Sequence, residues 1–184
     1  IYVTGSNSIG MYGDGIGSSV YNNGNIYLDA TGATSLNLKN QMIGIYLDNG
    51  AHGENWGDVK TLSNYAGNTN VNTLVGISVQ RGSTFENHGN IEINSDNGVG
   101  VYVNNGIIKN YGTITVIGDE STGVKYKNGE VAPGVPLTPS NVGGTVTSVG
   151  GNSFEELLSN PTATVGNVVI APDANGRLVA TLNG

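Results

Sequence analysis

Two short patterns of apolar and polar positions alternate along the chain. The first is Gly-Φ-x-Φ, where Φ is an apolar residue, and the second is Asn-x-Gly-x-Φ. Copies of the first pattern begin at Gly10 (an imperfect copy), Gly44, Gly76, Gly100 and Gly123, and copies of the second begin at Asn22, Asn55, Asn87 and Asn110. Because apolar and polar positions alternate within each copy, both patterns predict short strands with one buried face.

The two patterns follow one another in strict order, once each per unit. Successive glycines of the first pattern are 34, 32, 24 and 23 residues apart. The two longer units carry their extra residues at the same place, within 31–41 and 66–73. A unit of about 23 residues cannot bury its apolar side alone, so units of this size stack. We therefore predict an all-β solenoid in which equivalent strands pair in parallel, with about 23 residues per coil and loop insertions.

Stacking places equivalent residues of successive units above one another. At one corner, Asn22, Asn55, Asn87 and Asn110 would form a ladder in which each side-chain amide donates to the next. The glycine two residues after each asparagine (24, 57, 89 and 112) fits a corner that needs a positive φ. The apolar positions expected to point inward form three columns: Val20, Phe85, Ile108; Ile26, Val59, Ile91, Ile114; and Ile45, Ile77, Val101, Val124.

The pattern breaks after residue 129. Residues 131–139 contain three prolines and predict an extended loop. Ser153-Phe154-Glu155-Glu156 has the spacing of a helix capping box, which predicts a short helix to about Ser159, before Pro161. The strand pattern then resumes. We expect one β-helix segment over 1–184, with regular coils over 5–129, an insertion over 130–160 and a further coil over 161–184.

Composition and charge narrow the partners of the chain. Seven Lys and Arg against fourteen Asp and Glu give a net charge of −7, which disfavours nucleic acid and anionic membrane surfaces. No apolar run approaches the roughly 20 residues that span a bilayer. There is no cysteine, and the chain starts inside the pattern at Ile1, so we expect a fragment of a longer protein.

The unit that starts at Gly100, Gly-Val-Tyr-Val-Asn-Asn-Gly-Ile-Ile-Lys-Asn-Tyr-Gly-Thr-Ile-Thr-Val, resembles the passenger repeats of autotransporters, the type V bacterial surface adhesins. It is most similar to those of the large fusobacterial outer-membrane adhesins. The resemblance covers roughly residues 5–129 and, less clearly, 162–184. It implies a right-handed parallel β-helix and export to the cell surface through a C-terminal outer-membrane barrel that this sequence does not contain. It also implies adhesion to host-cell receptor proteins or glycans, or to other bacteria.

Catalytic and metal-binding chemistry has little support in the sequence. Polysaccharide-degrading β-helix enzymes need clustered carboxylates, whereas the acidic doublets here are Asp119-Glu120 and Glu155-Glu156. His52 and His88 are too isolated for a zinc site. We therefore expect no enzyme, no metal and no cofactor, and keep a polysaccharide-degrading enzyme as the least favoured alternative.

Recognition is the better candidate. One outward column would hold Tyr12, Tyr46, Ser78, Tyr102 and Lys125, and a second would hold Asn23, Trp56, His88 and Tyr111. Exposed aromatic side chains in line suit contact with sugars or proteins, so the ligand-binding candidates are Trp56, His88, Tyr111, Tyr46 and Tyr102, together with the inserted loops. Two readings remain open. The aromatic columns bind a ligand, or they only stabilise neighbouring coils of a stalk that projects a distal head. The oligomeric state is also open.

Overall fold

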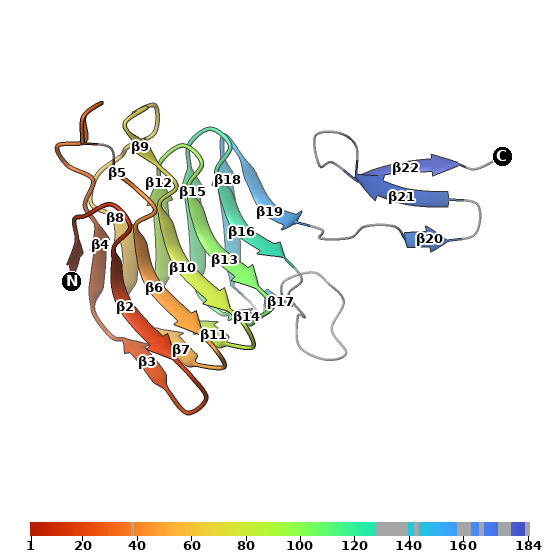
Figure 1. The fold of residues 1–184 in the computed structure, drawn as a ribbon, viewed down its shortest axis with the longest axis horizontal. Helices are drawn as coiled ribbons and strands as arrows, with labels where there is room; N and C mark the ends of the chain where they lie inside the picture. Colours follow the sequence, from red (N-terminus) through yellow and green to blue (C-terminus); the bar gives the residue numbers. More distant parts are fainter. Residues whose placement is uncertain are drawn as a thin grey trace.

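The chain is all-β, and most of its strands pair in parallel sheets. A computed structural model describes residues 1–37, 39–127, 140–141, 144–157, 163–165, 168–172 and 178–182. In these residues every regular element is a strand and no helix occurs. Figure 1 shows three sheets whose strands succeed one another along the stack. The predicted fold class is confirmed to this extent.

Each of the three parallel sheets takes one strand from each successive repeat unit. The first sheet contains β2 (Ile9–Asp14), β6 (Ile43–Asp48), β10 (Val75–Gln80), β13 (Val99–Asn104), β16 (Thr122–Lys127) and β19 (Asn152–Leu157). The second sheet contains β3 (Ser19–Asn22), β7 (His52–Asn55), β11 (Thr84–Asn87), β14 (Ile107–Asn110) and β17 (Ser140–Asn141). The third sheet contains β1 (Tyr2–Val3), β4 (Asn25–Leu28), β8 (Asp58–Thr61), β12 (Asn90–Asn94), β15 (Thr113–Ile117) and β18 (Thr145–Val149).

The chain visits the three sheets in a fixed order and then returns to the first. We call one passage, such as β6–β7–β8, a rung. Each strand pairs in parallel with its equivalent in the next rung, and the register follows the repeat, with Ile45 opposite Ile77 and Asn55 opposite Asn87. Parallel pairing therefore joins residues one repeat unit apart.

The apolar residue of each alternating pair points to the interior, where the three sheets share one core. Ile77, Phe85 and Ile91 come from three successive strands of one rung, and each is at most 1% exposed. Burial of side chains of this size stabilises the fold by about 1.5–3 kcal/mol each. All the predicted inward residues belong to this buried cluster.

The inserted segments at 31–41 and 66–73 lie beside one another. Within them, β5 (Lys39–Asn40) pairs in parallel with β9 (Val71–Asn72). Tyr65 lies just before the second insertion, is buried, and accepts a hydrogen bond from the Ala30 backbone N–H at 3.1 Å. The two insertions thus follow the same stacking rule as the rungs.

The corner glycines have a different role from the one predicted. Gly24, Gly57, Gly89 and Gly112 are not among the residues with positive φ. A Cβ at Gly57 would lie 2.0 Å from the carbonyl oxygen of Gly24, and Gly89 and Gly112 lie equally close to the corner before them, so these three glycines are needed where one corner passes close over the next, whereas Gly24 has no atom within 4 Å of such a Cβ. Positive φ values occur at the bends into the first sheet and between the first and second sheets, as at Asn97 (53°) and Asn49 (53°).

The predicted short helix is wrong over the described residues. Residues 152–157 form β19, which pairs in parallel with β16 and places Phe154 opposite Val124. A capping box is a local preference worth about 1 kcal/mol, and pairing along a whole strand outweighs it. The last residues of the predicted helix, 158 and 159, lie outside the described residues.

The predicted insertion at 130–160 contains strands of the three parallel sheets. Besides β19, it holds β17 and β18, and Asn141 of β17 lies in register with Asn110. The predicted loop at 131–139 lies outside the described residues.

The last strands differ from the further coil expected over 161–184. They are β20 (Ala163–Val165), β21 (Val168–Pro172) and β22 (Leu178–Leu182). These strands pair antiparallel with one another, whereas a further coil would pair in parallel with β17–β19.

Candidate functional site

The asparagine corner orients a line of side chains on the outer face of the second sheet. Asn22, Asn55, Asn87 and Asn110 are all buried. The first three donate from Nδ2 to Oδ1 of the next, at 2.7, 2.9 and 2.8 Å, and Asn110 Nδ2 donates to the carbonyl oxygen of Thr145. Because each asparagine points inward, the residue that follows it points outward. The residues that follow the asparagines of successive rungs therefore lie above one another.

The residues after three of these asparagines are Trp56, His88 and Tyr111, which we call the aromatic ladder. The rings of Trp56 and His88 are stacked, with centroids 3.9 Å apart and planes 9° apart. The rings of His88 and Tyr111 are stacked at 4.7 Å and 2°. Trp56 is 56% exposed and Tyr111 37% exposed, so the ladder is accessible at the surface.

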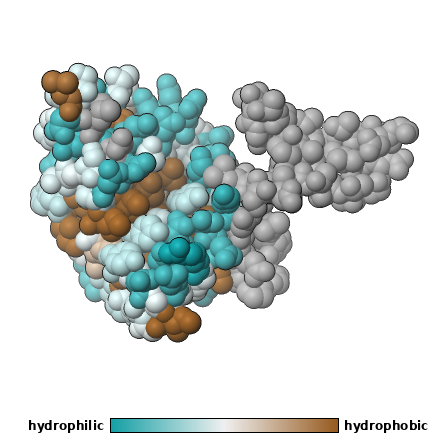
Figure 2. All heavy atoms as spheres, in the orientation of Figure 1, coloured by the Kyte–Doolittle hydropathy of each residue, from teal (hydrophilic) through white to brown (hydrophobic). Residues whose placement is uncertain are grey.

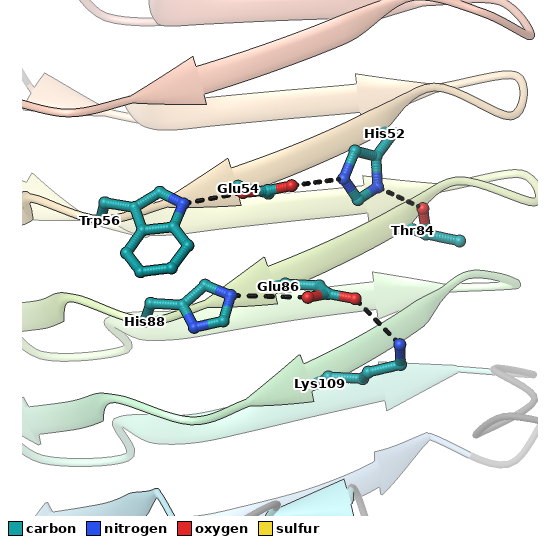
Figure 3. Close-up of polar contacts among 7 residues, drawn as sticks. All are labelled: His52, Glu54, Trp56, Thr84, Glu86, His88 and Lys109. Atoms are coloured by element: carbon teal, nitrogen blue, oxygen red, sulfur yellow. Dashed lines mark hydrogen bonds and ion pairs between the residues drawn. The ribbon is translucent and has the colours of Figure 1, made fainter.

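A carboxylate holds the indole ring of Trp56 in place (Figure 3). Trp56 Nε1 donates to Glu54 Oε2 at 2.7 Å, and His52 Nε2 lies 3.1 Å from Glu54 Oε1. His52 Nδ1 is in turn 2.9 Å from Thr84 Oγ1 on the next strand. The hydrogen bonds from Trp56 and His52 lower the pKa of Glu54, because they stabilise its charged form.

The next rung repeats this arrangement with different partners. Lys109 Nζ donates to Glu86 Oε1 at 2.9 Å, and His88 Nε2 lies 3.4 Å from Glu86 Oε2. The hydrogen bond with Lys109 lowers the pKa of Glu86 and raises that of Lys109. His52 thus links β7 to β11 through Thr84, Glu86 links β11 to β14 through Lys109, and each carboxylate contacts the ring beside it (Figure 3).

The ladder offers a ligand unequal surfaces. His88 has a ring on each side, so both of its faces are occupied. Trp56 is covered by His88 on one face, and the equivalent position in the preceding rung is Asn23, which is exposed and has no ring to stack. The accessible aromatic surface therefore includes the second face of Trp56 and the ring edges.

Tyr46 and Tyr102 lie on a different sheet from the ladder. They belong to the outward column of the first sheet, in which Tyr12 and Tyr46 stack at 5.7 Å and 28°. Ser78 occupies the position between Tyr46 and Tyr102, so the tyrosines do not form a continuous stack. The five binding candidates therefore fall into two separate groups.

The partners Glu54, Glu86 and His52 were not anticipated from the sequence. Glu54 precedes Trp56 by two residues, and Glu86 precedes His88 by two residues. Positions two apart on a strand share a face, so this spacing could have indicated the pairing.

The described residues contain neither a potential metal-binding site nor a membrane-spanning helix. In them, no group of three or more His, Asp or Glu side chains could hold a metal ion. Within the same part of the chain, no helix is long and apolar enough to cross a bilayer. Comparison of the chain with protein-family models, curated proteins and solved structures finds no match.

Proposed function

We propose that this chain is a segment of an autotransporter-type passenger at the bacterial cell surface, folded as a right-handed parallel β-helix. In this proposal it is an adhesin segment that binds glycan or protein receptors on host cells or other bacteria. It carries no catalytic role and uses no cofactor, and the carboxylates beside the aromatic rings serve to orient them. The cyclic order of the three parallel sheets and the repeat that resembles such passengers support this proposal.

The aromatic ladder is the observation that carries the binding role. Trp56 is more than half exposed, yet its indole N–H is bonded to Glu54 and one ring face is packed on His88. A ring that is already held in one orientation loses little conformational entropy when a ligand stacks on it. Rigid exposed aromatic side chains of this kind are common at recognition surfaces.

A stalk without a ligand is the second candidate, and the stacking itself favours it. The His88 ring between Trp56 and Tyr111 joins three rungs, which stabilises the stack whether or not anything binds. The two functions differ in what happens at the open face of Trp56.

Trp56 is the only tryptophan of the chain, so its fluorescence reports directly on the ladder. We expect a glycan array or host-cell binding assay to identify ligands, and those ligands to shift Trp56 emission in a saturable titration. Trp56→Ala should weaken binding about tenfold or more, as hot-spot aromatic residues do. Tyr27→Ala, on the outer face of the third sheet, is the matched control. Absence of binding to every glycan and cell surface would favour the stalk.

A further inference from the structure

The Gly-Φ-x-Φ pattern turns two successive residues inward. In β10, Ile77 is fully buried, and a Cβ at the preceding Gly76 would lie 2.8 Å from Ile91 Cγ2 in the core. In β13, a Cβ at Gly100 would likewise lie 2.6 Å from Ile114 Cγ2. Strict alternation would send one residue of each pair outward, so the alternation is interrupted at the glycine of each of these strands, while the register between the strands continues unshifted.

This interruption leaves a gap on the outer face of the first sheet. Outward side chains are three positions apart there instead of two, as with Val99 and Tyr102. The residues before the glycines form one column in register: Ile9, Ile43, Val75 and Val99. Figure 2 shows a hydrophobic band that runs across the strands of this face. Over β10 and β13 the gap deepens into a depression of about 390 Å³, which we call the groove.

The groove has an apolar floor and two polar sides. Val75 and Val99 form the floor. One side is made by Thr73, Asn97 and Glu120, which occupy equivalent bends in successive rungs and have φ values of 52°, 53° and 55°. The repeat therefore builds this side from stacked bends.

The opposite side consists of Tyr102 and Lys125. The charged groups around the groove sum to a net negative charge. Lys125 Nζ lies 3.1 Å from Glu155 Oε2, so its charge is already paired. Glu120 on the other side is exposed, and in the described part of the chain it forms no ion pair. Two carboxylates and one ammonium therefore surround the groove, in a chain whose net charge is −7.

We propose that the groove binds a neutral oligosaccharide, a second site that rests on the proposed glycan-binding function but is separate from the ladder. The C–H face of a sugar ring fits the valine floor and the tyrosine ring, and its hydroxyl groups reach the hydroxyl, amide and carboxylate groups on both sides. The size lies in the range of about 300–1,000 Å³ typical of ligand sites. An extended peptide would need a free strand edge, whereas β10 and β13 are paired on both sides. The uncompensated carboxylate disfavours acidic sugars.

The test uses the full chain with ¹³C-methyl valine and a ¹⁵N-labelled Trp56 indole. The probes are neutral oligosaccharides of the glucose, galactose and N-acetylglucosamine series, against sialylated oligosaccharides. We expect saturable shifts of the Val75 and Val99 methyl signals with at least one neutral series and none with the sialylated probes. Val99→Lys should weaken that binding about tenfold or more, whereas Thr115→Lys, on the outer face of the third sheet, should change it less than about twofold.

The outcomes separate the two sites. If only the Trp56 signal shifts, the proposed groove site is refuted and the aromatic ladder is the binding site. If only the Val75 and Val99 signals shift, the groove is the binding site and the ladder is not. No saturable shift with any neutral probe, or stronger binding of sialylated probes, would also overturn the groove. If Val99→Lys does not fold, Tyr102→Ala replaces it, with the same loss of affinity expected.

Discussion

The hydrogen bonds between the buried asparagines should contribute substantially to the free energy of unfolding, and Asn55→Ala tests this. Asn55 is fully buried, accepts from Asn22 Nδ2 at 2.7 Å and donates to Asn87 Oδ1 at 2.9 Å. The substitution removes these two amide–amide hydrogen bonds, each worth about 1 kcal/mol net, as well as the bond from Asn55 Nδ2 to its near neighbour Gly57 O. It also leaves the buried Asn87 Oδ1 without its amide donor, which costs about 1–3 kcal/mol more.

The expected loss for Asn55→Ala is therefore about 3–5 kcal/mol in the free energy of unfolding. Asn22→Ala at the end of the ladder removes one amide–amide bond, and about 2 kcal/mol is expected. Asn23→Ala is the control, because Asn23 is next in sequence but exposed, and its change should stay within about 0.5 kcal/mol.

Urea denaturation followed by circular dichroism measures all three variants against the unchanged chain. A loss below about 1 kcal/mol for Asn55→Ala, or an equal loss for Asn23→Ala, would refute the view that the ladder hydrogen bonds stabilise the stack.

Three further predictions concern packing and pH. Gly57→Ala should destabilise by about 3 kcal/mol, because its Cβ would meet the Gly24 carbonyl oxygen, whereas Gly24→Ala, with no atom within 4 Å, should be nearly neutral in the same urea assay. Phe85→Ala should cost about 3–5 kcal/mol, since Phe85 is 1% exposed, and a loss under about 1 kcal/mol would contradict the assigned core. The lowered pKa values of Glu54 and Glu86 mean that their contribution is full above the ordinary carboxyl pKa of about 4.3 and is lost as the pH falls through the folded-state values. The double variant Glu54→Gln, Glu86→Gln should therefore lose less stability between about pH 5 and pH 3 than the unchanged chain, and equal losses would count against these contacts.

The repeat was sufficient to predict the parallel strands, their register and the inward columns. This is possible because a short unit has only one way to bury its apolar side, namely against its own copies. The ladder asparagines follow from the same rule, since equivalent polar residues that are buried together must bond to one another.

Contacts between rungs were decided by the tertiary structure. Residues that touch across rungs are 23 to 34 positions apart, so local signals do not describe them. In the sequence, a glycine at position 57 is compatible either with a positive φ or with a close approach of the backbone. The position of Gly24 beside it in the structure shows that the close approach is the reason. Ser153-Phe154-Glu155-Glu156 favours a helix locally, but β16 offers a full strand of hydrogen bonds, and the longer pairing prevails. The groove also depends on the tertiary structure. In the paired strands the glycine and the apolar residue after it both face the core, so the outward side chains on either side of them lie farther apart.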